Sequence, residues 1–390
     1  MAKRGSRRRG AAAEIERLRA RIDRLDGEIL GLVSQRAELA RGIGQAKDDG
    51  GRPAFAPDRE AAIFRRLADE NPGPLDPEAV RAVFREIVSG CRALEARLRV
   101  AYLGPEGTFA QRAARLQFGD SVDYAPERNI EAVFGAVRRR ECDYGVVPVE
   151  TSAGGAVVDS LDLFVEYDVK IAAEIVLPIH HYLLSKSGLE DVKIVYSKPQ
   201  ALHQCRGWLE ANLPHAALCD SDSTAKAARL AASRKGVAAI GAKEAAELYG
   251  LDVVGEHLED DPRNQTRFWV LGHHYGAPTG RDKSSIMVAI GDRVGALLDL
   301  LVPFKQHRLN LLRIDSRPSK RRAWDYVFFL DFRGHVSDPE VKKALADVEK
   351  QAVFLTVLGS YPEPDAGTPI APRPKKKTGK KAAGKRALGK

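Results

Sequence analysis

The chain is organised around the stretch Asn264-Gln265-Thr266-Arg267-Phe268. It lies between the acidic turn Glu259-Asp260-Asp261-Pro262 and the apolar run Trp269-Val270-Leu271, where a loop is expected to enter a strand. A hydroxyl beside a guanidinium at such a point can donate one hydrogen bond to a leaving oxygen and a bidentate pair to a carboxylate. This pairing favours an acidic substrate that loses a hydroxyl, although the pentapeptide alone also fits an ordinary loop end.

Length and cysteine usage limit the classes of protein that this chain can belong to. Its 390 residues suffice for two or three domains that each bury a core. Cys91, Cys142, Cys205 and Cys219 are scattered without Cys-x-x-Cys spacing, so we expect free thiols and neither a disulfide framework nor a zinc site. No apolar run approaches the roughly 18 residues of a membrane span, and no signal peptide is seen. We therefore expect a cytoplasmic protein, and no metal or organic cofactor is implied.

The formal net charge of +9 comes from the two ends of the chain. Residues 1–10 carry five Lys or Arg side chains and residues 371–390 carry nine, with no acid in either segment, so the body is net acidic. We expect residues 1–10 and 364–390 to be basic, disordered tails. Such tails can solubilise the protein or make weak, salt-sensitive contact with nucleic acid.

From Ile15 to Ala46 the apolar residues recur in steps of three and four, which predicts one long helix. At ~1.5 Å per residue this helix would be about 50 Å long, too long for two short partners to cover, so we expect it to pair with a second chain. Arg36 interrupts the apolar seam, and it either pairs with a buried acid or binds an anionic ligand. Lys47 returns to nearly the same face, whereas Arg19 could reach that pocket only from the partner.

Two shorter helices are expected to follow. The first opens at Pro57-Asp58-Arg59-Glu60, with acids at its positive end, and runs to Glu70. The turn Asn71-Pro72-Gly73-Pro74 separates it from a helix at residues 77–97. Residues 11–97 are therefore predicted to form a dimeric, all-α domain of three helices.

This segment resembles the all-helical chorismate mutases. The motifs that carry the resemblance are Leu18-Arg19-x-x-Ile22-Asp23-x-x-Asp26, Arg36-x-Glu38-Leu39-Ala40, Lys47 and Arg59-Glu60. The resemblance implies an intertwined dimer, in which Arg36, Lys47, Arg59 and Glu60 of one chain and Arg19 of the other surround a dicarboxylate. The reaction is a pericyclic rearrangement, so no nucleophile is needed. Arg19 and Arg36 would hold the carboxylates, Glu60 the hydroxyl, and Lys47 would face the ether oxygen as it gains negative charge.

Three positions depart from the best-known mutase pattern. Ala56 replaces an acid, Cys91 a serine that contacts substrate, and Glu95 a glutamine that faces the ether oxygen. A glutamic acid can donate a hydrogen bond there only when it is protonated. We therefore expect mutase activity to fall as the pH rises, and Glu95→Gln to flatten the profile. The alternative is a Glu95 that merely faces solvent.

Residues 99–274 show the alternating strand and helix signals of an α/β domain. Strands are expected at residues 100–103, 144–149, 169–178, 193–196 and 237–240. The first strand turns into Gly104-Pro105-Glu106-Gly107-Thr108-Phe109 before a helix, where backbone N–H groups and the positive helix end suit an anion. The fingerprint Gly-x-Gly-x-x-Gly is absent, so this loop suits a small carboxylate better than a dinucleotide.

Further motifs lie in loops after strands, where α/β proteins bind ligands. They are Pro148-Val149-Glu150-Thr151-Ser152, Tyr196-Ser197-Lys198-Pro199-Gln200-Ala201-Leu202-x-Gln204-Cys205 and Ser223-Thr224-Ala225. With the 104–109 loop and residues 264–268, they resemble prephenate dehydratase over the full segment. The resemblance implies two α/β lobes with the site in the cleft between them.

The same resemblance implies roles for individual side chains. Thr266 would be the essential hydroxyl that donates to the leaving oxygen, directly or through water, and Arg267 would orient a carboxylate. Residues implied to bind substrate are Thr108, Glu150, Thr151, Ser152, Ser197, Gln204, Asn264 and Phe268. Thr151 replaces a common asparagine and Lys198 a common histidine, from which we expect altered turnover or pH optimum.

Residues 283–363 are predicted to have the order βαββαβ, a small ferredoxin-like sheet backed by two helices. The exposed edges of so small a sheet favour pairing with a copy. Gly295-Ala296-Leu297 and Leu312-Arg313-Ile314-Asp315-Ser316-Arg317-Pro318, followed by Ser319-Lys320-Arg321-Arg322, resemble the phenylalanine-sensing ACT domain. The resemblance implies that Gly295, Ala296, Leu297, Asp315, Ser316, Arg317 and Pro318 bind phenylalanine, which inhibits the dehydratase by favouring a less competent arrangement of its lobes.

The sequence thus predicts a bifunctional enzyme that converts chorismate to prephenate and prephenate to phenylpyruvate in phenylalanine synthesis, and that phenylalanine inhibits. We expect a homodimer or higher homo-oligomer that does not bind a membrane. Two alternatives stay open. One is an active dehydratase with a silent mutase domain, given Ala56, Cys91 and Glu95. The other is a phenylalanine-responsive binding protein whose catalytic pockets have decayed and whose basic tails hold nucleic acid.

Overall fold

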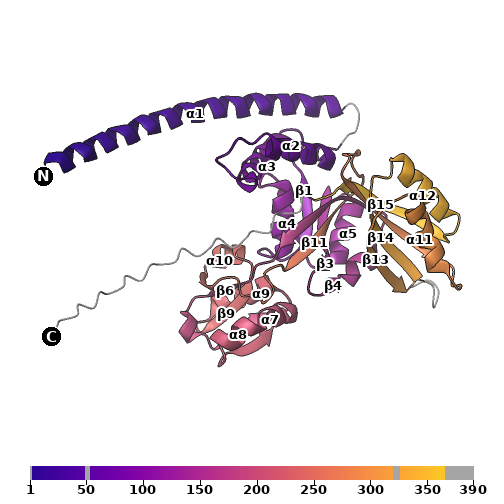
Figure 1. The fold of residues 1–390 in the computed structure, drawn as a ribbon. Coiled ribbons are helices and arrows are strands. Elements are labelled where there is room, and N and C mark those ends of the chain that lie inside the picture. The colour runs from indigo at the N-terminus through magenta and orange to yellow at the C-terminus, as the bar shows by residue number, and fades with distance from the viewer. Residues whose placement is uncertain (1, 49–52, 319–325, 365–390) are drawn as a thin grey trace, which may run out of the picture.

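The computed structural model describes residues 2–48, 53–318 and 326–364, which form a helical unit, two α/β lobes and a C-terminal unit (Figure 1). The predicted basic tail from residue 365 onward and the run Ser319-Lys320-Arg321-Arg322 lie outside these residues. Within the described ranges, no helix is both long and apolar enough to cross a membrane.

The helical unit consists of α1 (Ala2–Asp48), α2 (Pro57–Asp69) and α3 (Pro77–Ala93). A proline begins both shorter helices, and Asp76 caps α3 by accepting a hydrogen bond from the Ala79 backbone N–H at 2.7 Å. Helix α3 ends four residues before the predicted boundary. Residues 2–10, expected to be a disordered tail, instead continue α1, as suits a run rich in the strong helix former Arg.

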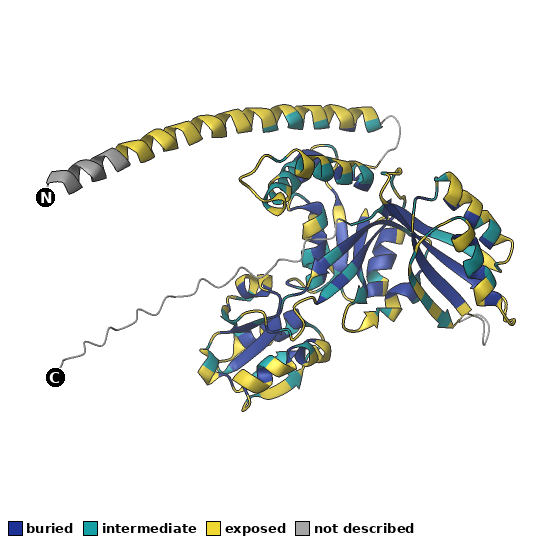
Figure 2. Ribbon diagram, viewed as in Figure 1, coloured by how far each residue is buried: buried dark blue, intermediate teal, exposed yellow. Residues whose placement is uncertain are grey.

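Helix α1 leaves most of its apolar seam uncovered (Figure 2). Ile15 is 49% exposed, Leu25 54% and Leu39 71%, although all three belong to the stripe that should be buried. Only the last turns of α1 approach α3. There a Cβ on Gly44 would lie 3.1 Å from atoms of Glu95, so a glycine permits the close contact. The described residues of a single chain therefore provide no partner for most of this stripe.

The first α/β lobe is built on a six-stranded sheet. Its strands are β1 (Arg99–Leu103), β2 (Asp123–Glu127), β3 (Tyr144–Thr151), β4 (Gly155–Ala156), β5 (Lys170–Pro178) and β11 (Gln265–Gly272). Helices α4 (Phe109–Phe118), α5 (Ile130–Arg138) and α6 (Val158–Leu163) belong to this lobe. The order is β2-β1-β3-β11-β5, with β4 paired to β3. Strand β11 lies between β3 and β5 and is antiparallel to both, although it is the last of these six strands in the sequence.

The second lobe has a five-stranded sheet in the order β10-β6-β9-β7-β8. Its strands are β6 (Tyr182–Ser185), β7 (Ile194–Ser197), β8 (Ala217–Asp220), β9 (Val237–Gly241) and β10 (Asp252–Gly255). Its helices are η1 (Leu189–Asp191), α7 (Pro199–Gln204), α8 (Arg206–Asn212), α9 (Thr224–Ser233) and α10 (Glu244–Tyr249). The chain passes between the lobes twice, at residues 179–181 and 256–264, and these segments are the two crossovers. The predicted two-lobed α/β architecture is confirmed.

The C-terminal unit has the predicted βαββαβ order. Its elements are β12 (Asp282–Ile290), α11 (Ala296–Gln306), β13 (Leu311–Pro318), β14 (Tyr326–Arg333), α12 (Pro339–Glu349) and β15 (Phe354–Pro362). The antiparallel sheet has the order β13-β14-β12-β15. One face packs on α11 and α12 through Phe304 and Phe332, and the other shares a core with the first lobe, where Trp269 belongs to the same cluster as Phe329 and Tyr361.

Candidate active and regulatory sites

Strand β11 places Thr266 and Arg267 on opposite faces of the first-lobe sheet. Thr266 pairs with Leu177 of β5, and Phe268, two residues further along β11, pairs with Ile175. Leu177, Phe268 and Ile175 share a core with α4, so Thr266 is on the face of the sheet that packs on α4. Arg267 points to the other face, because side chains alternate along a strand. The expectation that the two residues act together on one substrate is not met by this geometry.

Arg267 lies in a buried cluster of charges at the junction with the C-terminal unit. Its guanidinium donates to Glu150 at 2.6 Å, to Glu174 at 2.6 Å and to Asp331 at 2.8 Å. Burial lowers the pKa of Arg267, but Glu174 and Asp331 reverse this and raise it overall. Two predicted positions are therefore corrected: Arg267 binds protein carboxylates rather than a substrate carboxylate, and Glu150 faces Arg267 rather than the cleft.

Two more cations complete this charge cluster. Lys283 donates to both carboxylate oxygens of Glu174 at 2.9 Å, and Arg313 forms an ion pair with Asp315. Arg313 also lies 3.7 Å from Glu150 and 4.0 Å from Asp331. Burial disfavours the charged form of Asp331, yet the nearby cations lower its pKa overall. The cluster thus connects the strand of Thr266 to the strand that carries Asp315.

A different set of polar side chains meets where the two lobes join. Asn264 Oδ1 accepts from Ser152 Oγ at 3.2 Å and from Gln204 Nε2 at 3.4 Å. Gln204 Oε1 lies 2.9 Å from Nε2 of His181, whose ring contacts Phe109 edge to face at 5.6 Å. Ser152 and Phe109 come from the first lobe, Gln204 from the second, and Asn264 and His181 from the crossovers.

Two atoms of this lobe junction have no hydrogen-bond partner among the described residues although they are buried. They are the amide nitrogen Nδ2 of Asn264 and the ring nitrogen Nδ1 of His181. Burial lowers the pKa of His181, which favours the neutral ring. With Nε2 facing the Gln204 carbonyl oxygen as a donor, Nδ1 is left as an acceptor. An unpaired buried polar atom costs about 1–3 kcal/mol, so a ligand offering one acceptor and one donor fits here.

The other predicted dehydratase residues fall into two groups. Thr151 lies at the lobe junction, where its Oγ1 accepts from Gln200 of the second lobe at 3.1 Å. Thr108 caps α4, and its hydroxyl donates to the Leu103 carbonyl at 3.0 Å. Ser197 and Phe268 are not in the cleft: Ser197 is fully buried and donates to the Ile240 carbonyl, and Phe268 is part of the first-lobe core. Their alternation along buried strands explains both corrections.

In the helical unit the structure brings Lys47 and Glu95 together. The Lys47 ammonium donates to the Glu95 carboxylate at 3.0 Å, and the Glu95 side chain is 12% exposed, so it does not simply face solvent. Cys91 lies one turn earlier on α3 and is buried. Arg36 is half-buried and Arg59 is exposed. Arg19 is exposed far along α1, where it pairs with Glu16, so it takes no part in this site within one chain.

Glu60 forms a buried ion pair with Arg92 of α3. Arg92 also donates to the Phe118 carbonyl of the first lobe at 2.5 Å, and its guanidinium lies over the Phe55 and Phe118 rings. Burial raises the pKa of Glu60, while the charge of Arg92 opposes that rise. The residue expected to hold a substrate hydroxyl is therefore connected to the neighbouring lobe through Arg92.

The predicted effector residues lie at one end of the C-terminal sheet. Ile290 pairs with Tyr326 and Tyr326 with Pro318, so the loop after β12, which leads to Gly295, lies near the end of β13. Gly295 has a φ of +81°, a conformation that favours glycine before α11. Ser316, Leu297 and Pro318 are exposed and Ala296 is buried. Asp315 and Arg317 face the first lobe instead, where Arg317 donates to Asp162 at 3.0 Å.

Sequence reasoning missed His181, Arg92 and Asp331. His181 could have been found, because the dipeptide His180-His181 directly follows a predicted strand, at the kind of position where α/β proteins bind ligands. No local pattern distinguishes Arg92 from its charged neighbours on α3. The side chains that pair with Asp331 are distant in the sequence, so no local sequence pattern identifies it as part of a charge cluster.

Comparison with known proteins assigns these units to families. Residues 18–96 match the model of chorismate mutase type II, residues 100–275 that of prephenate dehydratase, and residues 284–350 that of the ACT domain. A solved structure of prephenate dehydratase in complex with L-Phe from Arthrobacter aurescens is 33% identical with a TM-score of 0.64, and the match covers 68% of this chain and 90% of that one.

Curated relatives match all three units in one chain. The bifunctional chorismate mutase/prephenate dehydratase of Aquifex aeolicus is 45% identical over 90% of this chain and 98% of the relative. The relative of the same description from Escherichia coli K12 is 31% identical over 91% and 97%. The fold and its sites thus define a multidomain enzyme of aromatic amino acid biosynthesis. The chain belongs to the family of bifunctional chorismate mutase/prephenate dehydratase enzymes with a C-terminal ACT domain.

Proposed function

We propose that the dehydratase site is the junction between the lobes, with Thr266 beside it. The observation that carries this proposal is the chain of contacts His181–Gln204–Asn264–Ser152, which contains two unpartnered buried atoms, one on His181 and one on Asn264. Prephenate offers the matching chemistry: a carboxylate to accept from Asn264 Nδ2 and a hydroxyl to donate to His181 Nδ1. Thr266 is only 9% exposed and is the second residue of β11, which begins directly after Asn264.

At this site Thr266 assists departure of the substrate hydroxyl. Prephenate loses carbon dioxide and hydroxide, and its ring becomes aromatic. A free hydroxyl is a weak acid, so Thr266 contributes by a hydrogen bond that strengthens as negative charge grows on the leaving oxygen. Arg267 is a positioning residue, because its three carboxylate partners connect β11 to β3, to β5 and to the ACT domain.

The mutase site needs a second copy of the chain. Lys47 and Glu95 are already paired, but Arg19 is far from both, and the apolar stripe of α1 is exposed. Pairing two α1 helices covers that stripe and brings Arg19 of the partner copy to the substrate carboxylates. Lys47, released from Glu95, then faces the ether oxygen.

Regulation by phenylalanine is proposed from the ACT domain, because a related dehydratase has been solved in complex with L-Phe. The exposed Leu297 and Pro318, together with Gly295, lie at the end of the sheet where a second ACT domain could complete the site. We also place the enzyme in the cytoplasm. All four cysteines are unpaired, and three of them are buried, as is usual for proteins that do not meet an oxidising compartment.

One experiment tests both activities. The purified chain is incubated with chorismate, and prephenate and phenylpyruvate are followed separately. Thr266→Ala should accumulate prephenate, with dehydratase kcat lowered by roughly 10²-fold or more and the melting temperature unchanged. Thr356→Ala, on β15 of the ACT domain, is the matched control. Parent-like phenylpyruvate formation by the Thr266 variant would refute its role. A parent chain that fails to consume chorismate but converts added prephenate would have only the dehydratase activity.

A further inference from the structure

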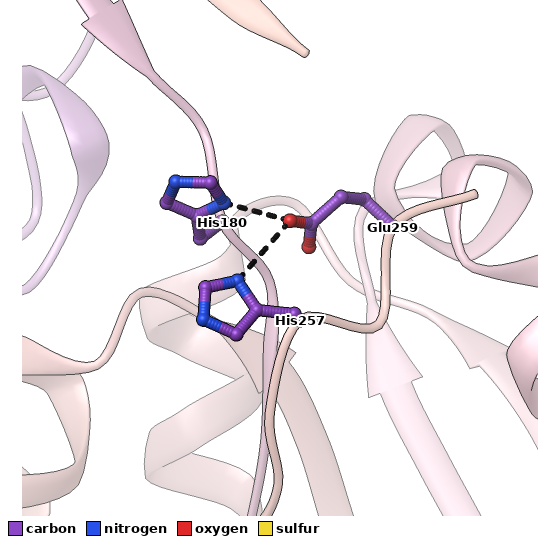
Figure 3. A group of neighbouring side chains, drawn as sticks. All are labelled: His180, His257 and Glu259. Atoms are coloured by element: carbon purple, nitrogen blue, oxygen red, sulfur yellow. Dashed lines mark hydrogen bonds and ion pairs between the residues drawn. The ribbon is translucent and has the colours of Figure 1, made fainter. Parts of the chain in front are cut away.

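The side chains of His180, His257 and Glu259 meet where the two crossovers between the lobes lie side by side (Figure 3). We propose that they form a binding site for a divalent transition-metal ion of the zinc class. Each offers one ligand atom, and these three atoms lie within 4.8 Å of one another. None of the three is used in the dehydratase chemistry described above.

The donor set and its spacing suit such an ion. Two imidazole nitrogens and one carboxylate oxygen are a ligand combination that zinc takes, with bonds of about 2.0–2.2 Å. In a tetrahedral site two such ligands lie about 3.4 Å apart. Glu259 Oε1 lies 2.7 Å from His180 Nδ1 and 3.5 Å from His257 Nδ1. An ion that replaces the protons between these atoms needs only small side-chain shifts to be bound by all three.

The surroundings of Glu259 favour this role over a chance surface cluster. Its side chain is only 2% exposed, and its second oxygen accepts from the His181 backbone N–H at 2.8 Å. The first oxygen faces the two imidazoles. His257 has a φ of +53°, which few non-glycine residues adopt, and this turn directs its ring toward Glu259. Because His257 is 57% exposed, the open side of the site can admit an ion and its remaining water ligands.

The position of the site gives a bound ion a mechanical role. His180 lies on the first crossover between the lobes, and His257 and Glu259 lie on the second. A metal ion would tie these two segments together where backbone hydrogen bonds already join them, from Leu258 N to the His181 carbonyl at 3.0 Å and from Ile179 N to the Asn264 carbonyl at 2.8 Å. The ion would thereby fix the angle between the lobes and the position of His181.

The competing interpretation is a hydrogen-bonded His180–Glu259 pair that takes no metal. It accounts for the 2.7 Å contact but gives no role to His257, whose nitrogen faces the same oxygen at 3.5 Å. The two interpretations differ in one measurable quantity, the amount of metal held per chain and its dependence on His257. Because His257 is exposed, replacing it should leave the fold intact.

The test uses the full-length protein, freed of metal with a chelator and titrated with Zn²⁺ by calorimetry and with Co²⁺ by visible absorption. We expect one ion per chain, and a Zn²⁺-dependent rise in melting temperature. His257→Gln should weaken Zn²⁺ binding by at least about tenfold and abolish the thermal shift. His274→Gln, which alters an exposed histidine outside the cluster, is the matched control and should behave as the parent.

Glu259→Gln provides a second variant that keeps the shape of the side chain but weakens the ligand. Binding that survives both His257→Gln and Glu259→Gln would mean an adventitious ion only, and a parent chain that binds no Zn²⁺ would likewise overturn the proposal. Any effect of Zn²⁺ on prephenate turnover rests on the proposed dehydratase function. The stoichiometry and the thermal shift do not, so failure of the metal site is distinguishable from failure of that function.

Discussion

The Arg267 guanidinium donates a hydrogen bond to Asp331 at 2.8 Å across the boundary between the dehydratase lobe and the ACT domain. Arg267 is the chain neighbour of Thr266, and Asp331 also accepts from Ser285 at 2.6 Å. The strand that carries the proposed catalytic hydroxyl is therefore held directly by the regulatory domain. Since Arg313 joins Asp315 to the same cluster, a change at the effector end of β13 reaches β11 through ionic contacts.

Asp331→Asn should destabilise the protein and weaken inhibition. The substitution removes a buried charge that faces three cations, for which a cost of about 3–5 kcal/mol is usual. We expect a lower melting temperature and dehydratase activity that responds less to phenylalanine, while calorimetry still detects phenylalanine binding. Asp252→Asn, at an exposed position on β10 of the second lobe, is the control. Unchanged inhibition in a folded Asp331 variant would show that the cluster does not transmit the effector signal.

Arg267→Met should lower both stability and activity, whereas Thr266→Ala should lower activity alone. The methionine variant leaves Glu150, Glu174 and Asp331 without their shared cation, so we expect a strongly lowered melting temperature along with lost activity. The alanine variant should lose turnover at an unchanged melting temperature. Thermal melting and steady-state kinetics on both variants separate the two roles. A stable Arg267→Met protein with a raised KM would instead return Arg267 to the substrate site.

Arg92→Leu should impair the mutase selectively. It leaves Glu60 buried without its cation, which favours the protonated carboxyl, a weaker acceptor for a substrate hydroxyl. We expect mutase kcat to fall about tenfold or more, with prephenate turnover largely retained. The double variant Arg92→Leu, Glu60→Gln removes the unpaired charge and should restore stability without restoring mutase turnover. Equal losses in both activities of the single variant would indicate general unfolding instead.

Leu25→Lys should separate the chains and the two activities. Leu25 lies in the middle of the exposed stripe on α1, where a charge opposes pairing with a second helix. Analytical ultracentrifugation should show a smaller assembly, and chorismate consumption should be lost because Arg19 no longer reaches the neighbouring site. Arg24→Lys, adjacent on the helix, is a conservative control. A mutase that stays active as a monomer would contradict the shared site.

The stability of the ACT domain should depend on pH through His307. Its ring nitrogens lie 3.1 Å from Asp347 and 3.3 Å from Glu340, and hydrogen bonds to these carboxylates raise the pKa of His307 in the folded protein. The folded state then holds a proton more tightly than the unfolded chain does. Its contribution is fully present below the unfolded pKa of about 6.5 and is lost as the pH rises through the folded value.

The check for this effect compares melting temperatures of the parent and His307→Gln from pH 5.5 to 8.5. The difference between the two should be largest at the acid end and should shrink as the pH rises. Lys343 and Lys350 also contact Glu340 and Asp347, so they share these carboxylates with the histidine and limit the size of the effect. A gap that is constant with pH would rule out the protonated ring as its source.

Much of the fold follows from local patterns, but the direction of individual side chains needed the strand geometry. The long helix, the two lobes and the βαββαβ order follow from periodicity and turn residues. Thr266 and Arg267 were expected to act side by side, yet consecutive residues on any strand face opposite ways. Ser197 is a second example. A serine at the end of a strand is expected to be exposed, but its hydroxyl donates to the Ile240 carbonyl inside the sheet.

Contacts between units could not be predicted from the sequence. Arg92 meets Phe118, and Arg267 meets Asp331, only because separate units pack on one another, and no spacing within either segment encodes that packing. Residues 2–10 were expected to be disordered because of their charge, but the same Arg residues also have high helix propensity when they extend an existing helix.

Trp269, Phe329 and Tyr361 belong to one hydrophobic core. The regulatory domain is therefore also a structural part of the dehydratase domain. A sensor joined by a loose tether could be cut away and leave a working, unregulated catalyst. Here, ending the chain before β12 would expose the apolar face of the dehydratase sheet. It would also leave the buried Arg267 and Glu174 without their partners in the ACT domain. Release from inhibition is therefore more easily gained by point substitution at the effector end than by truncation.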